Sequence, residues 1–227
     1  MRAPLLFSIA TCVVLAATTG FEAQTATPAG SGRIRGRVIV PESPAPAPRP
    51  AVADLTASAA PPIDRRRVVV YLETAPRQAF SEIQPGRARM DQRGQQFVPH
   101  LLAVTVGTTV DFPNNDKTFH NVFSLSRIRT FDLGRFAPGR TGSVRFNRPG
   151  IVPVFCDIHA HMSSYVLVFG HPYFAVSDES GRYSIEDVPV GDYSLAVWSE
   201  LGGTLPRRVS VRDGTIAEAN FQITREP

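Results

Sequence analysis

Residues 156–162 read Cys-Asp-Ile-His-Ala-His-Met and follow directly after an apolar run. This short segment offers a thiolate from Cys156, an imidazole from His159 and a thioether from Met162. A further imidazole, that of His120, lies upstream in the segment Asp-Lys-Thr-Phe-His-Asn-Val. Two histidines, one cysteine and a weakly bound methionine form the ligand set of mononuclear blue-copper sites. Three donors on one loop cannot close such a site alone, so a neighbouring strand must supply the fourth.

His161 leaves an alternative ligand set open. A site that pairs Cys156 with His161 would need a methionine further along the chain, and none follows Met162. The spacing therefore favours His159, with His161 beside the site in the loop. The other two histidines, His100 and His171, are expected at a strand edge and in a turn between domains.

Other metal centres fit the sequence less well. A dinuclear copper-A centre is excluded, because it needs two bridging cysteines. A structural zinc site usually contains more thiolates and no thioether. We therefore expect one mononuclear copper ion as the cofactor.

The N-terminal segment is typical of an exported protein. Arg2 is followed by the uncharged residues 3–21, which predicts a signal peptide over residues 1–23, with an uncleaved anchor as the alternative. Cleavage would remove Cys12 and leave Cys156 unpaired in an oxidising compartment, so a disulfide within the chain is excluded. We expect a periplasmic or secreted protein with no later membrane span, in which the remaining cysteine is a ligand.

The charge pattern gives no indication of nucleic-acid binding. The chain has a formal net charge of +4, and Lys117 is its single lysine. The basic residues are almost all arginines, and they form no dense stripe. The cluster Arg65-Arg66-Arg67 precedes an expected strand and is most simply a solvated strand edge.

Short apolar runs separated by turn residues predict strands throughout the central region, and no window shows sustained helical periodicity. The strands expected between residues 90 and 169 are 97–98, 101–106, 108–112, 120–125, 142–146, 151–156 and 165–169. All five histidines fall inside this block or at its edge. The pattern is that of an all-β sandwich or barrel.

The flanking regions also read as β-structure. Residues 24–32 are small and polar and are expected to form a flexible leader. Residues 41–62 are rich in proline and alanine, a composition that favours extended chain and cannot build a core. The flanking strands expected are 33–40, 68–72, 174–176, 182–185, 193–198, 206–211 and 219–223. Because no metal-binding residue types cluster after residue 173, a structural role is expected there.

The central block resembles the cupredoxins. The resemblance covers about residues 88–170 and is carried by the run 104–114, by His120-Asn121-Val122 and by the spacing Cys-x-x-His-x-x-Met, which is that of the amicyanin branch. It implies a Greek-key β-sandwich in which the Asn121 side chain braces the cysteine loop. The copper ligands that it implies are His120, Cys156, His159 and Met162. The whole layout is also similar to periplasmic proteins of methylamine utilisation.

Residues 174–195 resemble the carboxypeptidase regulatory-like modules, which are small transthyretin-like β-sandwiches. The opening strands of such a module lie far upstream, at 33–40 and 68–72. We therefore expect a discontinuous module of residues 33–75 plus 172–225, with the cupredoxin (76–171) inserted in it. The alternative is two consecutive domains, with 68–72 serving as a cupredoxin strand.

The resemblance implies that the protein carries single electrons between redox partners such as a cytochrome, with His159 as the electron port. No acid or base accompanies the predicted ligands, and every ligand position is filled, so we do not expect an enzyme. The alternatives are a copper storage, delivery or sensing protein of the cell envelope, or a metal-free structural interaction module. The redox partner and the oligomeric state do not follow from the sequence.

Overall fold

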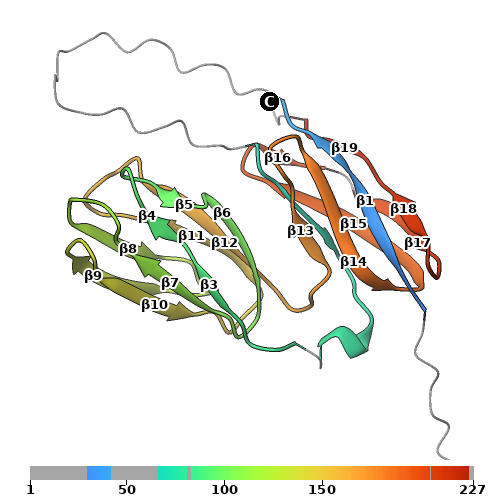
Figure 1. Cartoon of the computed structure of the whole chain (residues 1–227), viewed down its shortest axis with the longest axis horizontal. Coiled ribbons are helices and arrows are strands. Elements are labelled where there is room, and N and C mark those ends of the chain that lie inside the picture. The colour runs from blue at the N-terminus through green and yellow to red at the C-terminus, as the bar shows by residue number, and fades with distance from the viewer. Residues whose placement is uncertain (1–29, 42–65, 81–82, 205, 225–227) are drawn as a thin grey trace, which may run out of the picture.

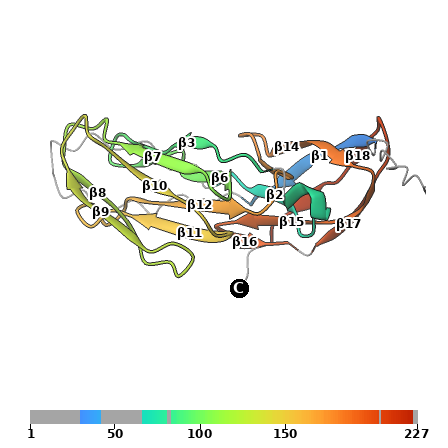
Figure 2. The same cartoon turned by 90° about the horizontal axis from the view of Figure 1, so that it is seen from below.

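A computed structural model describes residues 30–41, 66–80, 83–204 and 206–224. The predicted signal peptide, most of the predicted leader and nearly all of the proline-rich stretch lie outside them. The described residues form an all-β fold, as the sequence predicts. Apart from one 3₁₀ turn, η1 (Arg77–Phe80), their regular elements are strands, which form two lobes lying side by side (Figures 1 and 2).

The first lobe is a β-sandwich made of ten strands, which are β3 (Arg87–Arg89), β4 (Asp91–Gln92), β5 (Phe97–Val98), β6 (Leu101–Thr105), β7 (Thr109–Pro113), β8 (His120–Ser124), β9 (Phe131–Phe136), β10 (Thr141–Arg145), β11 (Gly150–Phe155) and β12 (Ser163–Phe169). A five-stranded sheet has the order β6-β12-β11-β8-β9, and a three-stranded sheet has the order β10-β7-β3. Both sheets contribute side chains to one buried apolar cluster. The hairpin of β4 and β5 lies beside them.

The second lobe is a β-sandwich made of nine strands, which are β1 (Ser31–Ile39), β2 (Val69–Leu72), β13 (Phe174–Val176), β14 (Arg182–Pro189), β15 (Gly191–Ser199), β16 (Gly202–Gly203), β17 (Arg207–Val211), β18 (Ile216–Glu218) and β19 (Phe221–Gln222). One sheet has the order β14-β1-β18, with β19 also paired to β1. The other has the order β13-β2-β15-β16, with β17 also paired to β15. Their facing side chains form a second buried apolar cluster.

The strands of the second lobe come from both ends of the chain. Strand β1 pairs with β14, β18 and β19, and strand β2 pairs with β13 and β15. All the strands of the first lobe lie between these two sets in the sequence (Figure 1). This pairing is the one that an inserted sandwich requires. The domain limits at residues 75 and 172 stay a prediction.

Strand β1 has the alternation expected of a half-buried strand. Ile34 and Val38 are buried, and arginines at alternate positions are exposed. Between them lies Gly36, where an added Cβ would stand 1.8 Å from the carbonyl oxygen of Ala219. Glycine is therefore required at this position, because any side chain would separate β1 from the C-terminal strands.

Strand β2 is buried on both faces. Val68 and Val70 belong to the core of the second sandwich, whereas Val69 between them packs with Leu101 and Leu167 of the first sandwich. A strand covered on both faces reads as a continuous apolar run rather than as an alternating one. The sequence Val-Val-Val at this point thus reflects the contact between the two lobes.

Strand β9 is not among the strands that the sequence predicts. It lies at the edge of the five-stranded sheet, and its Gly134 has a φ of +70°, which interrupts the alternation of apolar and polar residues. The very short strands β3, β4, β16 and β18 were not predicted either. Such strands are defined by their pairing partners, which local sequence does not reveal.

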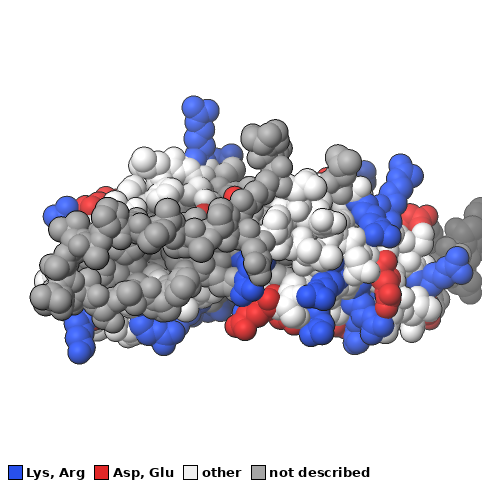
Figure 3. Space-filling view, turned by 90° about the horizontal axis from the view of Figure 1, so that it is seen from above, with Lys and Arg blue, Asp and Glu red and all other residues white. Residues whose placement is uncertain are grey.

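No continuous basic stripe is visible among the described residues on the face drawn in Figure 3. On the face drawn in Figure 3, basic side chains stand singly or in small groups and are mixed with acidic ones over the second lobe. This distribution is in line with the absence of a dense basic run in the sequence. Within the described ranges, none of the helical structure is long or apolar enough to cross a bilayer.

His171 lies in the bend where the chain passes from the first lobe to the second, as the sequence predicts, and it is buried there. Its Nε2 lies 3.0 Å from the carbonyl oxygen of Leu72, and its Nδ1 accepts a hydrogen bond of 3.2 Å from the backbone N–H of Tyr173. These two contacts require the neutral ring with its proton on Nε2. Burial lowers the pKa of His171 below its ordinary value of 6.5, and the hydrogen bond to Leu72 offsets part of that effect.

The protein is therefore expected to lose stability below about pH 6.5, because the unfolded chain then binds a proton at His171 that the folded chain resists. His171→Gln should weaken this pH dependence and should lower the unfolding free energy at pH 8 by about 1–3 kcal/mol. Urea unfolding at several pH values between 5 and 8 measures both effects. His161→Gln is the matched control, because His161 is exposed. Identical pH slopes for His171→Gln and the wild type would contradict the prediction.

Candidate metal centre

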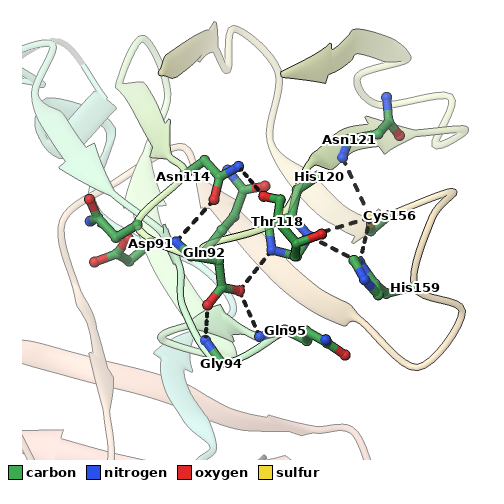
Figure 4. A network of polar contacts seen from close by, with 12 residues as sticks. Asp91, Gln92, Gly94, Gln95, Asn114, Thr118, His120, Asn121, Cys156 and His159 are labelled. Carbon is green, nitrogen blue, oxygen red and sulfur yellow. Dashed lines mark hydrogen bonds and ion pairs between the residues drawn. The ribbon is translucent and has the colours of Figure 1, made fainter. Parts of the chain in front are cut away.

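Two of the predicted ligands lie at the ends of strands β8 and β11. His120 is the first residue of β8, and its side chain is fully buried. Cys156 follows the last residue of β11 and is 5% exposed. The backbone N–H of Asn121 points at the sulfur of Cys156, with a nitrogen–sulfur distance of 3.4 Å (Figure 4). Two strands of one sheet thus hold the histidine and the cysteine side by side.

The loop 156–162 is closed by the register of its flanking strands. Phe155 of β11 pairs with Ser163 of β12, so that the seven residues between them form a short connection. Within it, the N–H of Cys156 donates to the carbonyl oxygen of Met162 at 3.2 Å. The N–H of Met162 donates in turn to the carbonyl oxygen of His159 at 2.9 Å. These bonds curl the loop back over Cys156.

Three of the four predicted ligands converge at one point. His120, Cys156 and His159 form a cluster whose donor atoms lie within 4.8 Å of one another. The Nδ1 atoms of His120 and His159 are 3.1 Å apart and lie 4.0 and 3.9 Å from the sulfur of Cys156. A point equidistant from these three atoms lies inside their triangle, about 2.1 Å from each, within the usual range of metal–nitrogen and metal–sulfur bonds. The donor set and its dimensions therefore fit a mononuclear metal ion.

The hydrogen bonds of the two imidazoles suit metal binding. The Nε2 of His120 donates to the carboxylate of Asp116 at 2.7 Å, so a neutral His120 ring has its lone pair on Nδ1. Burial lowers the pKa of His159, as do the neighbouring rings of His120 and His161, while Asp116 acts in the opposite direction. This shift favours the neutral form of the His159 imidazole, which is the form that metals require.

Met162 lies next to the cluster, and Asn121 has a different partner from the one expected. Met162 is 1% exposed and belongs to the same apolar cluster as Cys156. The Asn121 side chain was expected to brace the cysteine loop, but its Nδ2 donates to Asp132 on β9 at 2.7 Å. In Figure 4 this side chain points away from Cys156. Its backbone N–H, rather than its side chain, contacts the cysteine.

The remaining histidines lie outside the cluster. His161 is exposed on the loop, with its ring 6.1 Å from that of His159. His100 directly precedes β6, an edge strand of the five-stranded sheet, in agreement with the strand-edge position expected. It is partly buried there and joins the lobes, because its Nε2 lies 2.8 Å from a carboxylate oxygen of Glu200. Its Nδ1 lies 3.0 Å from the carbonyl oxygen of Ser163. The assignment of His120, Cys156, His159 and Met162 as ligands stays a prediction.

No protein-family model matches the chain, and no curated protein does. Among solved structures, a copper-containing nitrite reductase (NirK) from Thermus scotoductus SA-01 is 24% identical over 38% of this chain, with a TM-score of 0.36. The chain spans only 23% of that reductase. A purple cupredoxin from Nitrosopumilus maritimus is 23% identical over 36% of this chain and 99% of its own, with a TM-score of 0.34. A Cu(I) form of an amicyanin variant is 21% identical over 44% of this chain and 98% of its own, with a TM-score of 0.35.

Proposed function

We propose that this protein is a mononuclear type 1 copper protein that carries single electrons between redox partners in the periplasm or outside the cell. His120, Cys156, His159 and the weaker Met162 would hold the ion. The observation that carries the proposal is the triangle of two imidazole nitrogens and one thiolate sulfur, whose size fits a single ion. Two soft or borderline nitrogen donors, one thiolate and a thioether suit copper better than calcium or magnesium.

The surroundings of the donors support electron transfer in particular. Copper bound by this set supplies one-electron cycling between Cu(II) and Cu(I). His120 and Cys156 are anchored at strand ends in a buried core, so they are held with little freedom to move. Electron transfer requires neither a general acid nor a general base, and we propose that the protein is not an enzyme.

We propose that a redox protein docks at the edge of the site where His159 lies. His159 is the only partly exposed member of the donor triangle, whose other members are buried. Two exposed apolar residues directly precede the two histidines in the sequence: Phe119 before His120 is 56% exposed, and Ile158 before His159 is 38% exposed. Apolar surface around a partly exposed ligand suits a brief encounter with a partner, because it excludes water without requiring many charged contacts.

Copper delivery is the second candidate function. The exposed His161 beside His159 favours it, because a neighbouring imidazole could take up an ion that leaves the buried donors. A carrier of electrons holds both oxidation states in one set of ligands, whereas a delivery protein must release the ion. Retention of copper during reduction therefore separates the two functions.

Copper is expected to stay bound through repeated reduction and reoxidation by a soluble redox dye. Met162→Leu should raise the reduction potential by roughly 60 mV or more, a tenfold shift for a one-electron couple, because axial donors mainly tune the potential. Voltammetry and metal analysis after gel filtration measure both quantities. Met90→Leu is the matched control, since Met90 is buried in the same sandwich. Loss of copper at each reduction would exclude electron transfer. So would a Met162→Leu variant that loses most of its copper and shows an unchanged potential for the copper it retains.

A further inference from the structure

The carboxylate of Asp116 lies between a predicted metal ligand and a tight turn. Its Oδ2 accepts the Nε2–H of His120 at 2.7 Å and the backbone N–H of Gln95 at 2.7 Å. Its Oδ1 accepts the backbone N–H of Gly94 at 2.6 Å. One aspartate therefore connects the β4–β5 hairpin to the ring that faces the cluster.

The turn between β4 and β5 is shaped to bind this carboxylate. Residues 93 and 96 exchange backbone hydrogen bonds of 3.0 and 3.3 Å, which leaves Gly94 and Gln95 as the two central residues. Both have positive φ, of 62° and 54°, a conformation typical of the tight turns that join antiparallel strands. Their two successive N–H groups point at the same carboxylate and form an anion-binding nest. Gln95 keeps a left-handed conformation that residues with a Cβ rarely adopt.

The Asp116 contact determines which nitrogen of His120 is free. A carboxylate only accepts hydrogen bonds, so the neutral ring must carry its proton on Nε2. The lone pair is then on Nδ1, the atom that lies 3.1 Å from His159 and 4.0 Å from the sulfur of Cys156. Without Asp116, the proton could occupy either nitrogen, and a proton on Nδ1 would block the metal-facing atom.

We propose that Asp116 is a positioning residue of the metal centre: held by the amide nest of Gly94 and Gln95, it fixes the tautomer and ring orientation of His120. The inference rests on the proposed function only where it concerns the affinity of the site for a metal ion. The tautomer itself is a property of the metal-free chain. A carboxylate partner also makes the free nitrogen a stronger donor, and loss of such partners typically weakens metal binding 10- to 100-fold.

The test begins with metal-free protein labelled with ¹⁵N at histidine. In the wild type, His120 is expected to show the Nε2–H tautomer alone, and Asp116→Asn should show a mixture of the two tautomers. Titration with Zn²⁺, which needs no redox chemistry, should give a 10- to 100-fold weaker affinity for Asp116→Asn. Asp91→Asn is the matched control, because Asp91 lies on the same hairpin and bonds to Asn115 but to no histidine. It should leave the tautomer and the affinity unchanged.

Two further variants separate positioning from folding. Gln95→Gly keeps the amide of the nest and relieves the left-handed strain, so it should raise stability without changing the tautomer or the Zn²⁺ affinity. Asp116→Glu retains the carboxylate and should restore the Nε2–H tautomer even if Asp116→Asn does not fold.

A pure Nε2–H tautomer in folded Asp116→Asn, or the same Zn²⁺ affinity in Asp116→Asn and Asp91→Asn, would overturn the proposal. So would a mixture of tautomers in folded Asp116→Glu. Failure of the wild type to bind copper would instead count against the proposed function, and the tautomer result would stand by itself.

Discussion

Cys156→Ser is expected to abolish the intense visible absorption of the copper-loaded protein while leaving its β-sheet circular dichroism unchanged. The absorption of a blue-copper site comes from charge transfer between the thiolate and Cu(II), and a serine hydroxyl stays protonated near neutral pH and cannot replace it. The fold should persist, because the substitution keeps the side chain small. The backbone N–H of Asn121 can donate to the serine oxygen as it does to sulfur. Absorption and electron paramagnetic resonance spectra with one equivalent of Cu(II) measure the loss.

The wild-type spectrum is the control for this experiment and also a test of the metal assignment. A wild-type protein that takes up Cu(II) without any such band would rule out the blue-copper proposal. A Cys156→Ser variant that keeps the full band would show that the thiolate is not a ligand.

The second large effect concerns the two histidines of the loop. His159→Ala should lower the copper affinity by about 100-fold or more, equivalent to about 2.8 kcal/mol of binding free energy, whereas His161→Ala should change it by less than about threefold. The reason is geometric: the Nδ1 of His159 lies 3.9 Å from the sulfur of Cys156, and His161 is exposed outside the cluster. Competitive titration with a chelator of known affinity compares the two variants. Equal losses, or a larger loss for His161→Ala, would show that His161 is the ligand.

The sequence contains enough local information to predict the loop but not its support. The spacing of Cys156 and His159 puts their side chains on one tight connection, and the structure brings them together with His120. The bond from Asp116 to the turn at Gly94 escaped prediction, because it joins residues whose distance apart depends on how two strands pack. In an irregular segment, an aspartate four residues before a histidine does not predict a contact between the two side chains until the fold is known.

The strands show the same limit. The alternation in β1 and the apolar run of β2 could be read directly, because each pattern reflects the burial of that strand itself. Strand β9 could not, since Gly134 interrupts its pattern and its pairing with β8 is decided by the neighbouring strand. The contact of His100 with Glu200 links residues a hundred positions apart, and no local sequence pattern predicts it.

Because the strands of the second lobe come from both ends of the chain, the order in which the chain is synthesised affects how the protein assembles. Among the described residues, strand β1 pairs only with β14, β18 and β19, and β2 pairs only with β13 and β15. All the strands of the first lobe, together with the loop that holds Cys156, are complete by Phe169. Local pairings form faster than pairings between distant segments. The first lobe can therefore close around its donor atoms while the edges of β1 and β2 are still open. For that interval the growing chain has a finished cluster of donor side chains beside two unpaired strands, which invite association with other chains.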